Sequence, residues 1–167
     1  RESEPIMMLG NQVEWALHCV MILATVPKGK LLSSRALAEF HGVPKDYLSK
    51  CLQALSNAGL VNTTSGPYGG YSLAKSPNEI SFLDVVEAIE GKKKTFKCNE
   101  IRRNNPCLTE ADKKFSDLCA IAAIMHDADE AWRSALRNRK LSDITENLAA
   151  GASEESMSNL VRWIDKN

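Results

Sequence analysis

The chain has 167 residues, of which 44% are hydrophobic and 25% are charged, and its formal net charge is zero. These proportions are typical of a folded globular protein and exclude a disordered or fibrous one. The longest apolar stretch, residues 13–26, contains Glu14 and His18 and is too short to cross a bilayer, and no export signal is evident. We therefore expect a cytoplasmic protein that does not enter the membrane. Residues 1–6 carry no motif and are interpreted as an N-terminal extension or an expression remnant.

Three helices are predicted in the first third of the chain. Apolar residues recur every three or four positions over residues 12–26, as in an amphipathic helix. A second, short helix begins at Ser33 or Ser34, whose hydroxyl caps free amide groups, and stops at His41–Gly42. A third begins at Pro44, in the first turn, where proline is tolerated. A short helix, a tight glycine turn and a longer helix predict a helix-turn-helix.

A β-hairpin is predicted directly behind the helix-turn-helix. Residues 60–64 and 70–74 are strand-like, and the five residues between them include two glycines and a proline. A hairpin in this position is a wing. A further helix, over residues 81–91, completes a fold class that we predict to be mainly α with a small β-hairpin wing, a winged helix-turn-helix.

A long helix is predicted in the second half of the chain, from residue 118 to about Arg139, after a weakly patterned segment. Its apolar face is longer than a small winged-helix core requires, so we predict a dimerisation helix, with packing inside one chain as the alternative. The predicted dimer contacts are Leu118, Ala122, Met125, Trp132 and Leu136. A last helix over residues 154–164 has no evident role.

The predicted organisation after the extension has four parts. Residues 7–91 form the DNA-binding domain, 92–117 a cysteine-containing sensor loop, 118–144 the dimerisation helix and 145–167 a C-terminal tail with a short helix.

The segment from Lys28 to Lys75 has the charge and side chains of a DNA-binding surface. It contains six basic and two acidic residues, a net charge of +4, although the whole chain is neutral. Lysine, glutamine and hydroxyl groups on the second helix of a helix-turn-helix contact bases and phosphates, and a glycine-rich wing tip approaches the DNA closely. The alternative is a solvent-exposed polar face. The predicted contacts are Ser34, Lys45, Tyr47, Ser49, Lys50, Gln53, Ser65, Gly66 and Tyr68.

Residues 31–91, and above all GPYGGYSLA at 66–74, resemble the Rrf2 family of bacterial transcription regulators. The resemblance extends to MMLGNQVEWALHCVMILA near the N-terminus and to LSDI at 141–144. It implies a homodimer joined by long helices, in which each subunit presents a winged helix to half of a palindromic site. Family members often carry an arginine before the Gly-Pro of the wing, where this chain has Ser65.

The resemblance also implies a sensor. Some family members hold an iron–sulfur cluster, 2Fe–2S or 4Fe–4S, on three cysteines, and the cysteines of the corresponding region here are Cys98, Cys107 and Cys119. Glu14 corresponds to an acidic fourth ligand, and His126 is a weaker candidate.

The spacing of these cysteines leaves two arrangements open. If a helix starts at Thr109, which forms a capping-box pattern with Asp112, Cys107 and Cys119 lie roughly 15 Å or more apart and do not share a cluster. If the helix starts near Ser116, they meet. Without a cluster the cysteines form a thiol switch, with Cys107 activated by the neighbouring Arg102 and Arg103. Cys19 and Cys51 fall on apolar helix faces and are predicted to pack in the core.

These features predict a dimeric, sequence-specific DNA-binding transcription regulator controlled by a cluster or by thiol chemistry. The alternative is a cluster-free winged-helix regulator or a protein-protein adaptor, with structural cysteines; the adaptor is retained because the net charge is zero. No catalytic motif is present and His18, His41 and His126 are scattered, so we predict that the protein is not an enzyme.

Overall fold

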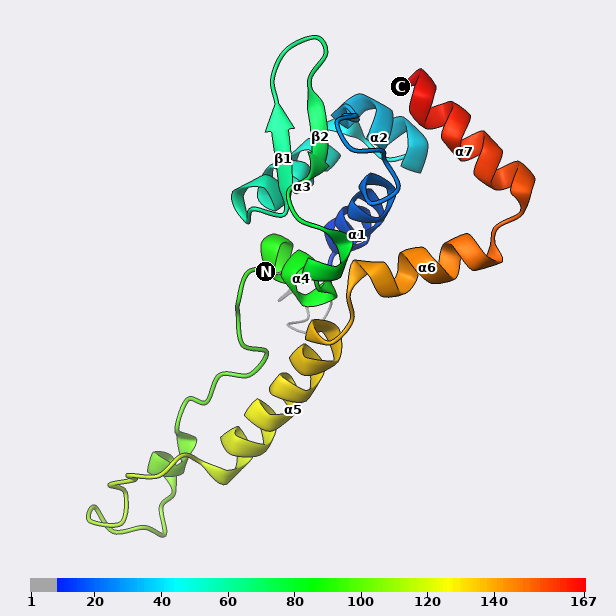
Figure 1. The fold of residues 1–167 in the computed structure, drawn as a ribbon. Coiled ribbons are helices and arrows are strands. Elements are labelled where there is room, and N and C mark those ends of the chain that lie inside the picture. Colours follow the sequence, from blue (N-terminus) through cyan, green and yellow to red (C-terminus); the bar gives the residue numbers. More distant parts are fainter. Residues whose placement is uncertain (1–8) are drawn as a thin grey trace. The chain divides into compact units, whose positions relative to one another are not determined.

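The structure is a computed structural model that describes residues 9–167. The predicted extension, residues 1–6, lies outside the described residues. The described chain forms two units (Figure 1). We call residues 9–91 together with 136–167 the head unit, and residues 92–135 the loop–helix unit.

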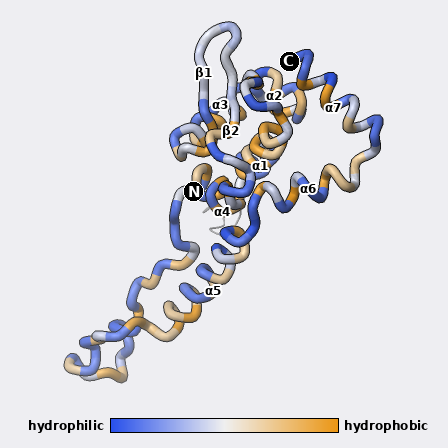
Figure 2. The backbone as a smooth tube through the Cα atoms, in the orientation of Figure 1, coloured by the Kyte–Doolittle hydropathy of each residue, from blue (hydrophilic) through white to orange (hydrophobic). Residues whose placement is uncertain are grey.

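Four helices of the head unit surround its hydrophobic core: α1 (Asn11–Leu23), α2 (Ser34–His41), α3 (Lys45–Asn57) and α4 (Phe82–Glu90). Each helix buries one apolar face, and Figure 2 shows the hydrophobic stretches along α1 and α4. Cys19 and Cys51 are buried in this head unit, as their sequence positions predicted, and burial raises the pKa of Cys19 to about 12. The predicted class, mainly α with a two-stranded hairpin, is confirmed.

The turn between α2 and α3 depends on a cap at one end of α2 and a glycine at the other. The Ser33 hydroxyl accepts a hydrogen bond from the Ala36 amide at 3.0 Å, so Ser33 is the N-cap and Ser34 the first helical residue. Gly42 ends α2 in the left-handed conformation, with φ of 64°. The chain therefore reverses within a few residues and presents α3 as the second helix of a helix-turn-helix.

The hairpin consists of β1 (Val61–Thr64) and β2 (Gly70–Leu73), which pair antiparallel with Val61 opposite Leu73. Leu32 and Tyr71 exchange backbone hydrogen bonds of 3.1 and 2.8 Å, which ties the hairpin to the residues before α2. Gly70 makes this approach possible, because a Cβ there would lie 2.6 Å from the Leu32 carbonyl oxygen. A short 3-10 helix, η1 (Pro77–Glu79), then leads to α4.

Two C-terminal helices, α6 (Leu141–Gly151) and α7 (Glu154–Lys166), also belong to the head unit. The sequence pattern indicated the second of them but not α6. The chain breaks between α5 and α6 because Arg139–Leu141 pairs in extended form with Ile80–Phe82: the Phe82 amide donates to Arg139 and the Leu141 amide to Ile80, at 2.9 and 3.0 Å. The continuous helical segment expected through this point is therefore two helices.

The loop–helix unit contains an irregular loop with the 3-10 helix η2 (Ile101–Asn104), followed by most of α5 (Ala120–Arg137). Thr109 and Asp112 form the reciprocal hydrogen bonds of a capping box, including Thr109 Oγ1 to Asp112 Oδ2 at 2.6 Å, but only a turn follows them. Of the two helix starts left open by the sequence, Thr109 is wrong and the one near Ser116 is the nearer, because α5 begins at Ala120. In the described part of the chain, no helix has both the length and the hydropathy required to span a membrane.

An ion pair within α5 positions an arginine that joins this helix to the start of the loop. Arg133 Nε donates to the Asp129 carboxylate at 3.0 Å, the Asp129 side chain is 8% exposed, and the other end of the Arg133 guanidinium donates to the Lys93 carbonyl. Burial favours the neutral acid, but hydrogen bonds from Arg133 and Thr95 outweigh it and lower the pKa of Asp129.

Asp129→Asn should reduce the amide protection factors of α5 about tenfold at pH 7, because a charged hydrogen-bond acceptor is lost. Since the pKa of Asp129 is lowered, its stabilising effect is complete above the ordinary aspartate value of about 4 and is lost as the pH falls through the folded value. Hydrogen exchange measured over this range should show the two proteins converging at low pH. Asp127→Asn, at an exposed position of the same helix, is the control. Equal protection at pH 7 would contradict the assignment.

Candidate DNA-binding surface and cysteine site

The outward face of α3 carries the predicted base and phosphate contacts. Lys45, Tyr47, Lys50 and Gln53 are exposed, and Ser49 is half-buried. Lys50 Nζ lies 5.5 Å from the centre of the Tyr47 ring, so the two side chains form a single cationic and aromatic patch. The inward face, which includes the fully buried Leu48 and Leu52, holds this patch rigidly on the core.

The tip of the wing is exposed and contains one large side chain. Tyr68 is 95% exposed, and Ser65 and Gly66 beside it are also exposed. Gly69 is required for the tight turn, because a Cβ there would lie 2.0 Å from the Thr64 carbonyl oxygen. A tyrosine with no packing role in this chain is available for an external contact.

Ser34 is half-buried at the start of α2, next to the exposed Arg35. Sequence reasoning counted Arg35 only as a charge. Arg35 lies in the first turn of α2, where side chains and amides contact phosphate, so this position makes it a further candidate for a phosphate contact.

Cys119 immediately precedes α5, and its carbonyl accepts a hydrogen bond from the Ala123 amide at 2.9 Å. Hydrogen bonds from the amides of Ala122 and Ile121, together with the charge of Arg102, lower the pKa of Cys119 against the opposing effects of burial and Glu100. The free amides at a helix N-terminus stabilise a thiolate. Cys119 therefore has the environment of a reactive cysteine.

Arg102 connects Cys119 with Cys98. Its guanidinium donates to the Glu100 carboxylate at 2.7 Å and to the Asp117 carbonyl at 3.0 Å, and it stacks 4.0 Å from the Phe115 ring centre. The hydrogen bonds that Arg102 donates to Glu100 raise the pKa of Arg102, and the charges of Cys119 and Cys98 raise it further. The arginine expected beside Cys107 thus interacts with the other two cysteines.

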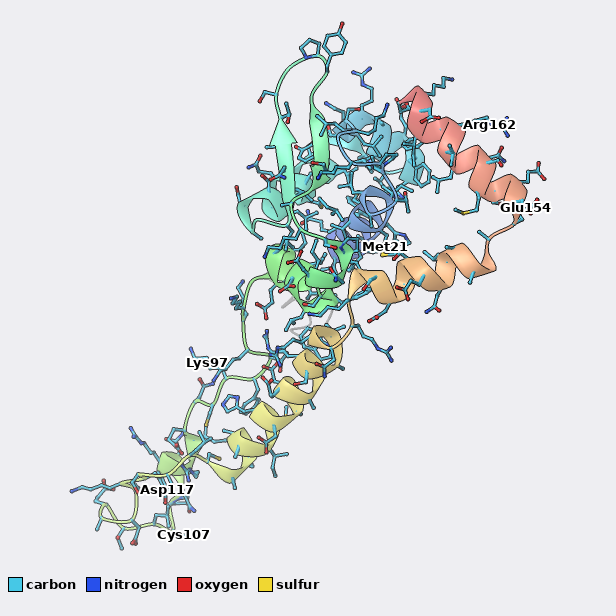
Figure 3. All side chains as sticks on the ribbon, viewed as in Figure 1. Met21, Lys97, Cys107, Asp117, Glu154 and Arg162 are labelled. Carbon is cyan, nitrogen blue, oxygen red and sulfur yellow. The ribbon has the colours of Figure 1, made fainter. Side chains whose placement is uncertain are left out.

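The other candidate ligands of a cluster, Cys107, Glu14 and His126, each have different neighbours. Cys107 is exposed in the loop, where Figure 3 labels it, and its amide donates to Asn105 Oδ1 at 2.9 Å. Glu14 is exposed on α1 of the head unit and lines a cavity of about 270 Å³ with His18 and His41. His126 packs against Phe96 with their ring centres 6.2 Å apart.

An iron–sulfur cluster does not fit this arrangement. Cluster thiolates converge within a few ångströms, but among residues 9–167 no three His, Cys, Asp or Glu side chains are grouped to hold a metal ion. Cys98 and Cys119 both interact electrostatically with the Arg102 guanidinium, which is held in place by Glu100 and Phe115. Two thiols beside a fixed cation suit thiolate chemistry.

The outer face of α5 is apolar and exposed. Ile121 and Ile124, both 67% exposed, form a stripe with Trp132 at helical spacing, and Met125 lies at its edge. Leu118 is exposed just before the helix and Leu136 is half-buried. Ala122, which the sequence pattern assigned to the dimer contacts, is instead fully buried, because it lies on the same helix face as Asp129. The sequence prediction did not name Ile121 and Ile124, although their spacing with Trp132 was visible in the sequence.

Several known transcriptional regulators are similar to this chain. The model of the Rrf2 family, described as an iron-dependent transcriptional regulator, matches residues 9–147. The HTH-type transcriptional regulator NsrR of Shouchella clausii (strain KSM-K16) is 28% identical over 141 residues, which cover 84% of this chain and 90% of NsrR.

Two solved structures have the same fold. CymR (YrzC), the global cysteine regulator of B. subtilis, matches with a TM-score of 0.64 and 21% identity over 84% of this chain and 98% of its own. T. potens IscR matches with a TM-score of 0.64 and 19% identity over 91% of this chain and 96% of its own. The helix-turn-helix, the wing and these matches lead to one conclusion: the chain is a DNA-binding transcriptional regulator, not an enzyme, and it belongs to the Rrf2 family.

Proposed function

We propose that the protein binds a palindromic DNA duplex as a homodimer, with α3 of each subunit in a major groove and the wing tip beside it. The observation that carries the proposal is the exposed patch of Lys45, Tyr47, Lys50 and Gln53 on a rigidly packed α3. Lysine donates to guanine or phosphate and glutamine pairs with adenine. The exposed Tyr68 then contacts the backbone or minor groove, in place of the arginine that other family members often carry at the position of Ser65.

Dimerisation uses the apolar outer face of α5. Large exposed apolar stripes on a helix are covered by a partner in stable proteins, and a second copy of the same helix is complementary by two-fold symmetry. Ile121, Ile124 and Trp132 supply the contact. Two heads joined in this way match two half-sites, which explains a palindromic operator.

The DNA affinity is controlled by oxidation at Cys119 and Cys98. The Cys119 thiolate attacks a hydroperoxide oxygen: an S–O bond forms, the O–O bond breaks and hydroxide or alkoxide leaves. The Cys98 thiolate then attacks the sulfenic sulfur, an S–S bond forms and water is released after protonation of hydroxide. Two thiols lose two electrons to one peroxide. Loss of the Cys119 thiolate charge beside Arg102, together with the new bond to Cys98, changes the packing in front of α5.

The test of DNA binding uses a duplex selected from random DNA by the protein itself. Replacing Lys50 and Tyr47 by alanine should weaken binding by about 10- to 100-fold and reduce the dependence of affinity on salt, because phosphate and base contacts are lost. Affinity is measured by gel shift from low to high salt. Lys166→Ala, which removes one lysine from α7, is the control and should bind as the wild type does.

The same measurement separates the DNA-binding regulator from an adaptor that does not contact DNA. Binding that never appears, or that persists unchanged into high salt, would contradict phosphate contacts by the helix-turn-helix.

A further inference from the structure

A pocket of about 300 Å³, partly open to solvent, lies in the head unit, between α1 and α2 on one side and α6 and α7 on the other. Met21, labelled in Figure 3, belongs to the α1 wall, and Phe40 and His41 belong to the end of α2. The α6 and α7 wall includes Leu148, Ala149 and other residues up to Leu160. Almost all of this second wall lies beyond residue 147, where the match to the family model ends.

The pocket is held open by contacts at its rim. The rings of Phe40 and Trp163 lie 4.6 Å apart, and Ile164 beside Trp163 is 4% exposed, so α7 is anchored on α2. Leu141, fully buried, fixes the start of α6 in the core. These contacts hold the start of α6 and the end of α7 against the rest of the head unit. The side chains between the two contacts leave the pocket unfilled.

The chemistry of the walls defines what fits. Among residues 9–167, no Lys, Arg, Asp or Glu lines the pocket, so a charged molecule would lose its hydration without gaining a partner from them. Aromatic rings and methionines, among them Phe40, Met21 and Met157, favour a flat aromatic ligand. The volume is at the lower end of the range for small-molecule sites.

One residue that lines the pocket has an unsatisfied polar atom. His41 Nε2 is buried and has no hydrogen-bond partner among the described residues. Burial, and then the nearby charge of His18, lower the pKa of His41, so its imidazole is neutral and retains a nitrogen able to accept a hydrogen bond. Buried polar groups in proteins are normally paired, and a ligand that carries a hydroxyl or amine would supply the partner.

We propose that this pocket is a binding site for a small, neutral, one- or two-ring aromatic molecule with a single hydroxyl or amine group, which pairs with His41. The ligand bridges α2 and the α6–α7 pair. Because α2 is the first helix of the helix-turn-helix, occupation of the site acts on the DNA-binding surface independently of the cysteines. That consequence rests on the proposed DNA binding, but the site itself does not.

The test measures binding of 1-naphthol to the full chain by calorimetry, without DNA. We expect saturable binding at one site per chain and a higher melting temperature, because the ligand binds only the folded state. Ala149→Trp, which fills the pocket, should weaken binding at least about tenfold. Ala150→Trp, on the same helix but outside the lining, is the matched control and should bind normally.

A second comparison tests the role of His41. The affinity for 1-naphthol relative to naphthalene should fall about fivefold in His41→Phe, because only naphthol loses a hydrogen bond. If Ala149→Trp does not fold, Ala152→Leu fills less of the same pocket and takes its place. Absence of saturable binding by the wild type, or equal binding by the Ala149 and Ala150 variants, would overturn the site. An unchanged naphthol-to-naphthalene ratio would overturn the role of His41.

Discussion

Replacing Ile124 by aspartate should convert the dimer into monomers and reduce operator affinity at least about 100-fold. Ile124 lies in the middle of the exposed stripe on α5, and two-fold symmetry brings two new carboxylates into one apolar contact. Burial of unpaired charges is strongly unfavourable, and a monomer also loses the gain that comes from engaging both half-sites. Light scattering gives the oligomeric state, and gel shift gives the affinity for the selected duplex.

The control keeps the helix but changes charge outside the stripe. Asp127→Lys alters the local charge by two at an exposed position on α5. It should remain a dimer and bind DNA. If Ile124→Asp also remains a dimer, the dimer interface lies elsewhere on the molecule, and the proposal that α5 forms it is wrong.

Cys119→Ser should abolish the effect of hydrogen peroxide on DNA binding, whereas the wild type should change its affinity at least about tenfold on oxidation. Cys119 is the thiol whose pKa is lowered, first by the amides of Ala122 and Ile121 and then by Arg102. A lowered pKa increases the thiolate fraction at neutral pH, and only the thiolate attacks peroxide. Gel shift before and after treatment, with mass spectrometry of the cysteines, follows both events.

Cys107→Ser is the matched control, because Cys107 lies in the same unit but is exposed and outside the Arg102 site. It should respond to peroxide as the wild type does. Equal loss of response in the two variants would indicate three-cysteine chemistry. A coloured, iron-containing protein after anaerobic purification would contradict control by free thiols and favour a cluster.

The helix-turn-helix and wing were predictable because local chemistry determines them. The hydroxyl of Ser33, the left-handed Gly42 and the close backbone approach at Gly70 each act over a few residues or in a recognisable turn. The chain therefore contains enough local information to place α2, α3 and the hairpin. The outward residues of α3 followed from helical periodicity once the inward face was identified.

The cysteine site and the start of α6 were not predictable in the same way. The capping pattern of Thr109 and Asp112 formed its hydrogen bonds without a helix, since no apolar face follows to be buried. Arg102 reaches Cys119 only because the loop folds back, which spacing does not show. The break before Leu141 comes from strand-like pairing with Ile80, a contact made across about 60 residues of sequence.

That pairing between Ile80–Phe82 and Arg139–Leu141 also sets the order of events during synthesis. Leu141 is a fully buried core residue of the head unit, yet it is translated about 50 residues after α4 ends. The ribosome must therefore synthesise the cysteine loop and α5 before Leu141 can pack into the core of the head unit. A nascent chain cannot present a finished DNA-binding surface before the segment proposed to regulate and dimerise it has been made.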